Sequence, residues 1–136
     1  MKKFAYLLLI LLICQCCHAE EKVTLRCDWN EETQEAFSRK VLEKAQVSTI
    51  FILDENNLYN SRGEVISNAN IEEKQISFTI DTSNSQNSIQ NTYIINRMSG
   101  SIKYLRDYKP KGYDADYRVI TKGNGRCKRI TNERLF

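Results

Sequence analysis

The chain has 136 residues, five cysteines, one histidine and a formal net charge of +3. This length is enough for one domain with a single hydrophobic core and excludes two ordinary domains. No stretch carries a catalytic motif or identifies a ligand, so the sequence constrains compartment, size and fold class more tightly than activity.

Residues 1–19 have the form of a secretory signal peptide. Two lysines follow the initial methionine, an apolar run covers residues 4–13, and the small residues Cys17 and Ala19 stand where a signal peptidase would cut. The apolar run is about half of the roughly 20 residues that a membrane-spanning helix needs. We therefore expect cleavage after Ala19 and export of residues 20–136 as one β-rich domain, to the periplasm or the medium.

Three cysteines at the end of the apolar run raise an alternative, in which one of them becomes the acylated first residue of a lipoprotein. Lipoprotein signals place small residues directly before that cysteine. A leucine and an isoleucine precede Cys14, whereas glutamine precedes Cys16 and another cysteine precedes Cys17. Lipidation is therefore the less favoured route.

Cleavage leaves two cysteines, Cys27 and Cys127, one near each end of the exported domain. An even pair in an oxidising compartment predicts one disulfide bond. Closing so long a loop removes unfolded-state entropy worth about 4 to 5 kcal/mol. The alternative is a pair of reactive thiols, which the basic neighbours of Cys127 (Arg126, Lys128 and Arg129) would favour.

Cleavage also removes the only histidine, His18. A domain without histidine has no Ser-His-Asp or Cys-His nucleophile and no histidine-bearing zinc site, and it lacks the commonest general base near neutral pH. The sequence therefore predicts a protein that is not an enzyme and that uses no cofactor or metal ion. Any catalysis would rest on carboxylates, lysine or tyrosine.

Alternation of apolar and polar residues predicts that most of the exported domain is β-strand. Strands are expected over residues 23–29, 47–53 and 75–81. Ile89–Tyr108 is expected to be the central hairpin, with its turn at Arg97–Gly100, because a glycine there can take the positive φ that a bulged turn needs.

Two further elements complete the predicted fold. Asn30–Gln46 begins with a capping residue and acidic side chains and has apolar residues at helical spacing, which predicts an amphipathic helix. Gly123–Gly125 predicts a tight turn in a last hairpin over residues 117–131. The expected fold class is mainly β (α+β): an antiparallel meander that curls towards a partly closed barrel, with one N-terminal amphipathic helix.

The two halves of the exported domain carry opposite charge. Residues 20–81 have 7 basic and 13 acidic side chains (net −6), whereas residues 82–136 have 11 basic and 4 acidic ones (net +7). Tyrosines alternate with the cations of the second half, which favours an anionic partner. The candidate binding face consists of Lys103, Tyr104, Arg106, Tyr108, Lys109, Lys111, Tyr113, Tyr117 and Arg118. The alternative is that the two halves neutralise each other within one sheet.

Paired carboxylates give the only sequence support for an enzyme. Glu72 and Glu73 are adjacent, and Asp114 and Asp116 alternate on one side of a short segment. Such pairs can act as acid and base or hold a cation, although turn and surface roles are far commoner. The enzyme alternative is thus a carboxylate-dependent hydrolase acting on an envelope glycan.

Ile95–Gly100 contains a hydrophobic-Asn-Arg turn, and Gly125–Lys128 is a Gly-x-Cys-Lys segment near a terminal Phe136. In these two segments the chain resembles a broad set of small secreted bacterial proteins. Those proteins carry a hydrophobic-Asn/Asp-Arg-x-Thr-Gly turn, where this chain has Ser99 in place of threonine. The resemblance covers residues 47–136 and implies a β-rich fold. It implies no activity and assigns no residue a function.

The sequence as a whole predicts an exported, non-catalytic interaction protein, inhibitor-like or envelope-binding. Its partner is expected to be an unidentified protein or an anionic envelope component, and export argues against nucleic acid. A purely structural or effector role in a host or neighbouring cell is a third hypothesis. The oligomeric state is left open by the sequence.

Overall fold

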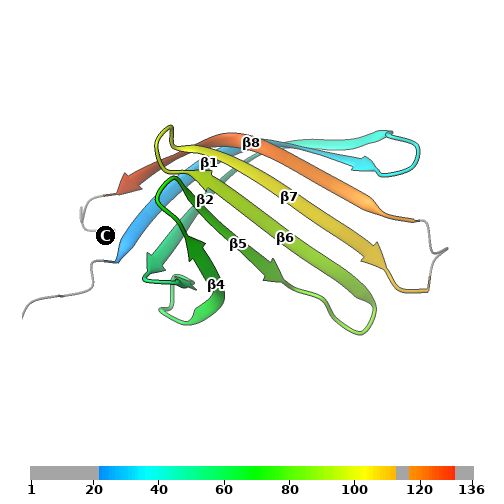
Figure 1. Ribbon diagram of the computed structural model, residues 1–136. Coiled ribbons are helices and arrows are strands. Elements are labelled where there is room, and N and C mark those ends of the chain that lie inside the picture. Colours follow the sequence, from blue (N-terminus) through cyan, green and yellow to red (C-terminus); the bar gives the residue numbers. More distant parts are fainter. Residues whose placement is uncertain (1–21, 113–116, 131–136) are drawn as a thin grey trace, which may run out of the picture.

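The computed structural model describes residues 22–112 and 117–130, which form eight antiparallel strands in a closed meander barrel (Figure 1). The strands pair in chain order, and β8 returns to pair with β1. They are β1 (Val23–Glu35), β2 (Val41–Asp54), β3 (Asn57–Tyr59), β4 (Val65–Ile71), β5 (Gln75–Asp81), β6 (Asn87–Asn96), β7 (Ser101–Pro110) and β8 (Val119–Ile130). The expected antiparallel meander that curls to closure is confirmed.

The first and last strands close the barrel. β1 and β8 pair along twelve positions, from Thr24 opposite Ile130 to Glu35 opposite Val119. Cys27 and Cys127 stand directly opposite each other in this ladder and lie at disulfide-bonding distance. The predicted pairing of the two cysteines thus joins the two strands whose pairing closes the barrel.

The central hairpin has the predicted turn between β6 and β7. Asn96 accepts hydrogen bonds on its side-chain oxygen from the backbone N–H groups of Met98 and Ser99, both at 2.9 Å. Gly100 has a φ of 68°, and a Cβ atom there would lie 2.8 Å from the carbonyl oxygen of Cys127. Positive φ and the close approach of β8 therefore both require glycine at this position.

The prediction of a helix over Asn30–Gln46 is wrong. β1 continues to Glu35, β2 begins at Val41, and residues 36–40 form the turn between them, with Arg39 at a φ of 55°. A helix needs a core against which its apolar stripe can pack, but Phe37, Val41 and Leu42 are 93%, 45% and 46% exposed. Pairing of β1 with both β2 and β8 along its whole length overrides the helical spacing of these residues.

The predicted tight turn at Gly123–Gly125 is also wrong, because β8 runs through these residues without a break. The glycines make room for Trp29 on the neighbouring strand. A Cβ atom at Gly123 would lie 2.5 Å from Cδ1 of the indole, and one at Gly125 would overlap the backbone of Asp28 and Trp29. Glycine within a strand can mark such a close approach as well as a turn.

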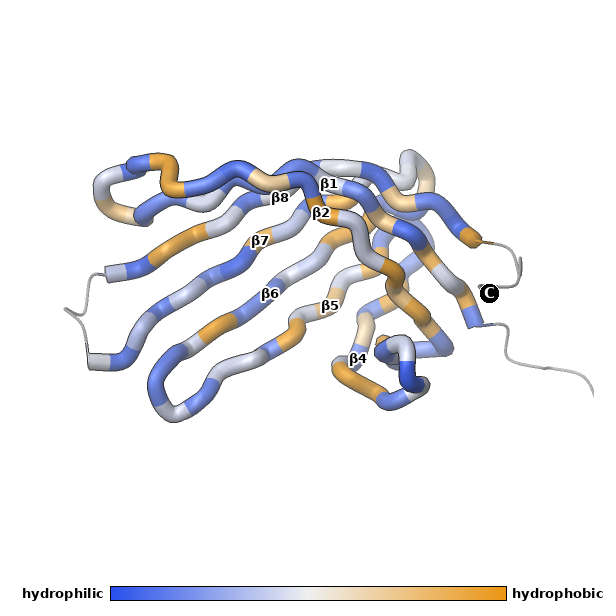
Figure 2. Tube along the Cα trace, turned by 180° about the vertical axis from the view of Figure 1, so that it is seen from behind, coloured by the Kyte–Doolittle hydropathy of each residue, from blue (hydrophilic) through white to orange (hydrophobic). Residues whose placement is uncertain are grey.

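The middle of the barrel is filled by aromatic rings. Trp29, Phe51, Phe78, Tyr93 and Tyr104 form a connected cluster whose neighbouring ring centroids are 5.0 to 6.1 Å apart. Hydrophobic and hydrophilic residues alternate along the strands that surround it (Figure 2). This aromatic cluster divides the interior into two ends with different linings.

The barrel wall is continuous at one end and open at the other. β2 pairs with β3 only over Ile52–Asp54, and β4 pairs with β5 only over Ala69–Ile71. Among the described residues, the edge of β2 from Val41 to Phe51 that faces away from β1 has no backbone partner. Figure 1 shows the β1–β2 hairpin extending well beyond the short β3 and β4. The interior is therefore accessible beside this free edge.

Candidate functional site

The structure divides the candidate binding face between the two sides of the sheet. Tyr104, Arg106 and Tyr108 alternate with Lys103 and Lys109 along β7, so the first three point into the barrel and the two lysines point out. Lys111 lies in the turn after β7, Tyr117 and Arg118 lie just before β8, and Tyr113 lies outside the described residues. The nine residues therefore do not share one surface.

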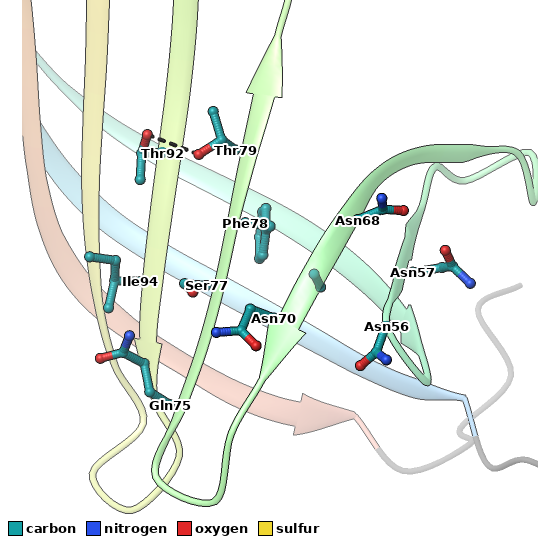
Figure 3. Close-up of a pocket in the computed structure, with 11 residues that line it drawn as sticks. Asn56, Asn57, Asn68, Asn70, Gln75, Ser77, Phe78, Thr79, Thr92 and Ile94 are labelled. Carbon is teal, nitrogen blue, oxygen red and sulfur yellow. Dashed lines mark hydrogen bonds between the residues drawn. The ribbon is translucent and has the colours of Figure 1, made fainter.

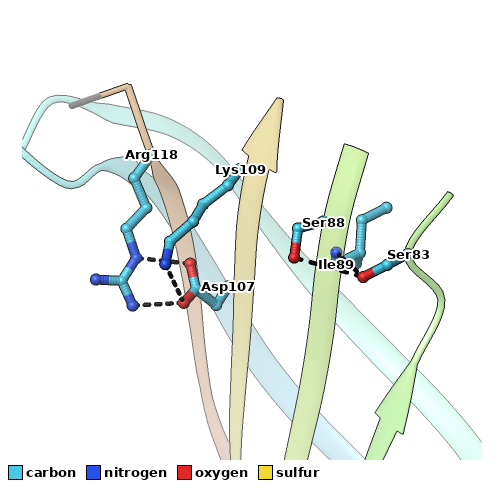
Figure 4. A network of polar contacts seen from close by, with 6 residues as sticks. All are labelled: Ser83, Ser88, Ile89, Asp107, Lys109 and Arg118. Carbon is cyan, nitrogen blue, oxygen red and sulfur yellow. Dashed lines mark hydrogen bonds and ion pairs between the residues drawn. The ribbon is translucent and has the colours of Figure 1, made fainter. Parts of the chain in front are cut away.

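Several of the outer cations already have partners. Arg118 donates to both carboxylate oxygens of Asp107 at 2.6 and 2.5 Å, and Nζ of Lys109 lies 3.9 Å from the same carboxylate (Figure 4). Lys111 donates from Nζ to the carbonyl oxygen of Asn84 at 2.9 Å. These contacts engage part of the positive charge within the fold, but all of them lie within residues 82–136, so they do not show that the acidic half neutralises the basic half.

A second contact in the same region fixes the connection between β5 and β6. The hydroxyl of Ser83 accepts a hydrogen bond from the backbone N–H of Ile89 at 2.9 Å and lies 3.4 Å from the hydroxyl of Ser88 (Figure 4). These two contacts hold the connection against the start of β6.

The inward residues of the candidate face meet polar residues of three other strands. Arg106 stands opposite Asn91 of β6 and Thr121 of β8, and Thr121 stands opposite Thr33 of β1. Tyr104 stands between Tyr93 and Gly123, and Gly123 stands opposite Glu31. We call these inward residues at the open end the concave site: Glu31, Thr33, Asn91, Tyr93, Tyr104, Arg106, Tyr108 and Thr121.

Hydrogen bonds hold most of the concave site in place. Tyr104 donates to Oδ1 of Asn91 at 2.9 Å, the hydroxyls of Thr33 and Thr121 lie 2.9 Å apart, and the indole of Trp29 donates to Glu31 at 3.2 Å. Arg106 differs, because no described residue forms an ion pair or side-chain hydrogen bond with it and it is exposed. A ring of fixed polar and aromatic groups thus surrounds one available guanidinium.

Burial and nearby charges keep Tyr93 and Tyr104 neutral. Burial raises the pKa of Tyr93 and Tyr104, the carboxylate of Glu31 raises both further, and the charge of Arg106 opposes the shift. Both phenols therefore stay protonated near neutral pH and act as hydrogen-bond donors, not as bases.

The carboxylate pairs singled out in the sequence do not enter this site. Glu72 accepts a hydrogen bond from the amide of Asn70 at 2.8 Å in the β4–β5 turn region, and Glu73 is exposed beside it. Asp114 and Asp116 lie outside the described residues. Within residues 22–112 and 117–130, no group of three or more His, Cys, Asp or Glu side chains is placed to hold a metal ion.

The sequence patterns also do not indicate the hollows of the barrel, of which two are lined by none of the residues of the concave site. At the opposite end of the barrel, a cavity of about 330 Å³ is lined by apolar side chains including Leu25, Leu53, Ile76 and Ile95, with Arg97 at its rim. On the outer wall, a broad groove runs beside the β4–β5 ladder (Figure 3). Its polar lining consists of Asn56, Asn57, Asn68, Asn70, Gln75, Ser77, Thr79 and Thr92. Each hollow gathers residues that are distant in the chain.

Comparison with protein-family models, with curated proteins and with solved structures finds no match to this chain. The geometry and chemistry of the concave site are therefore the basis of the proposed function.

Across the part of the chain that the structure describes, no helix is long and apolar enough to cross a membrane.

Proposed function

We propose that this chain is an exported, non-catalytic binding protein whose concave site holds an anionic ligand that carries a ring. The observation that supports the proposal most strongly is the exposed guanidinium of Arg106, which has no partner among the described residues and lies between Asn91 and Thr121. An arginine can bind a carboxylate or phosphate through two parallel hydrogen bonds.

The neighbours of Arg106 define the rest of the ligand. Tyr93 and Tyr108 lie on the same side of the sheet and are partly exposed, so they offer ring surface. The amide of Asn91 accepts from Tyr104 and donates to the carbonyl oxygen of Ile80, and its second N–H group can donate to a ligand. Such a set suits a sugar ring or another planar group that bears an acid. Peptidoglycan fragments combine sugar rings with carboxylates, so they are a suitable first probe for an envelope-binding protein.

Binding is tested by titrating the purified exported chain with a defined mixture of soluble peptidoglycan fragments in a calorimeter. Arg106→Gln should weaken binding about tenfold or more, because it removes a charge-assisted pair. Lys103→Gln removes the same charge from the outer side of the same strand and should leave the affinity unchanged. Equal losses in both variants, or binding that added salt does not weaken, would contradict a specific role for Arg106.

The same experiment separates binding from hydrolysis. A non-catalytic protein leaves the fragments intact, so mass spectra of the mixture before and after long incubation should be identical. New fragments that appear with the wild-type chain and disappear with Glu31→Gln would instead support the hydrolase hypothesis, since Glu31 is the carboxylate beside the two tyrosines.

Export has its own test. Because the positive start, the apolar run and Ala19 form one processing signal, the exported protein should begin at Glu20. Intact-mass measurement of protein recovered from the periplasm or the medium should give the mass of residues 20–136. A species that begins at Cys17 and carries acyl groups would establish a lipoprotein instead.

A further inference from the structure

The free edge of β2 is the longest stretch of unpaired strand backbone among the described residues. β2 pairs with β1 up to Leu53 but with β3 only from Ile52 onward, so Val41–Phe51 has a partner on one side alone. No backbone hydrogen bond elsewhere in the described chain involves these residues. Long free edges of this kind readily pair with another strand.

This edge has few of the features that normally prevent pairing. Proline is absent from it, and its outward side chains include Leu42 and Ile50, which are 46% and 44% exposed. The register between β1 and β2 shifts between Thr33 and Gln34, so only the end of the edge near Leu42 is irregular. Between that end and Phe51 the strand is regular.

The sequence of the edge is compatible with antiparallel pairing to an identical strand. Its midpoint is Gln46, and antiparallel pairing about that residue is the register in which two copies of Val41–Phe51 overlap completely. In this register, the residue numbers of two facing residues add up to 92. Leu42 faces Ile50, Glu43 faces Thr49, Lys44 faces Ser48 and Ala45 faces Val47 of the other copy. Apolar residues meet and no like charges face each other.

We infer that β2 pairs with β2 of a second copy of this chain about a two-fold axis at Gln46, which continues the sheet from one barrel into the next. An interface of this kind is isologous, because each copy contributes the same surface. It supplies backbone partners for the free edge of both copies at once.

The same arrangement gives a role to the most exposed large apolar side chain. Beyond Val41 of the second copy lies its residue 36–40 turn, and this turn would approach Phe51 of the first copy. A hollow near Phe51 is lined by Ile50, Ile66 and Ile80, with Tyr59 beside them. Phe37, which is 93% exposed within one copy, is placed on that turn to enter the hollow.

The register is tested by two matched substitutions at Ser48, which is exposed on β2 and would face Lys44 of the other copy. Ser48→Lys places like charges opposite each other twice in the dimer, and Ser48→Glu places opposite charges there. Within one copy the effect has the other sign, because Ser48 stands opposite Asp28 of β1. A change in the stability of the single barrel therefore cannot imitate the predicted order.

Sedimentation of the exported chain over a wide concentration series is the measurement. The wild-type chain should dimerise, and the dissociation constant of Ser48→Lys should exceed that of Ser48→Glu by about tenfold. Phe37→Ser should weaken the dimer without lowering the thermal unfolding temperature of dilute protein. A wild-type chain that sediments as a monomer throughout, or Ser48 variants that weaken association equally, would overturn the inference.

Discussion

Trp29 of β1 stands in register with Gly125 of β8, and the edge of its indole ring lies over Gly123. The two glycines therefore form the surface on which the tryptophan packs at the centre of the barrel. Trp29 is 4% exposed and contacts Tyr93 and Tyr104, so its position also fixes the rings that line the concave site.

Gly123→Ala and Gly125→Ala should each destabilise the protein, because an added methyl group would collide with Trp29 or its backbone. Forced displacement in a packed core costs about 1 to 3 kcal/mol. Chemical denaturation followed by tryptophan fluorescence measures the free energy of unfolding. Asn124→Ala is the control, since Asn124 lies between the glycines and is exposed. Glycine variants as stable as the control would mean that Trp29 does not pack there.

Cys27 and Cys127 should be recovered as one linked peptide pair when the protein is purified under oxidising conditions and digested without reduction. The two residues are 100 positions apart, so the bond should contribute up to about 4 to 5 kcal/mol by restricting the unfolded chain. Reduction should lower the unfolding temperature by the same amount as the double replacement C27A/C127A. Two free thiols in freshly purified protein would rule out the bond. The basic neighbours of Cys127 would then be expected to stabilise a reactive thiolate.

Alkaline titration should detect the buried tyrosines. Because burial raises the pKa of Tyr93 and Tyr104 above the ordinary value near 10, both should remain protonated after the exposed tyrosines have ionised. The contribution of these two neutral phenols to the free energy of unfolding is fully present below about pH 10. It is lost as the pH rises through their pKa values in the folded protein. Phenolate absorbance at 295 nm, in the wild type and in Tyr104→Phe, gives the titration curves. A wild-type curve with a single step near pH 10 would disagree with buried phenols.

Local alternation was sufficient to predict the strands whose one face is buried. The strand expected over residues 75–81 matches β5, and the strand expected over residues 23–29 lies within β1, where Leu25, Cys27 and Trp29 are buried. The turn at Arg97–Gly100 was also predictable, because positive φ leaves a signature in the sequence. These features depend on neighbours in the chain.

The errors arose where distant residues decide the local structure. Nothing near Gly123 in the sequence indicates that Trp29 lies against it, so local sequence alone does not distinguish this strand glycine from a turn glycine. The apolar spacing within Asn30–Gln46 suggested a helix, whereas pairing with β8 and β2 determines that segment. The concave site was only partly predicted, because Glu31 and Thr121 reach Arg106 and Tyr104 through barrel closure.

The central claim is that ligand binding occurs on the inner face of the open end, and side-chain NMR tests it most directly. A chain of residues 20–136, labelled with ¹⁵N, is titrated with the soluble peptidoglycan fragments. The signals of Arg106 Nε, the Asn91 amide and the Trp29 indole should shift together, whereas the backbone amides of Lys103 and Lys122, whose side chains point outward, should shift less. Shifts concentrated on the outer face of β7 and β8, or no shifts at saturating fragment concentration, would contradict the account.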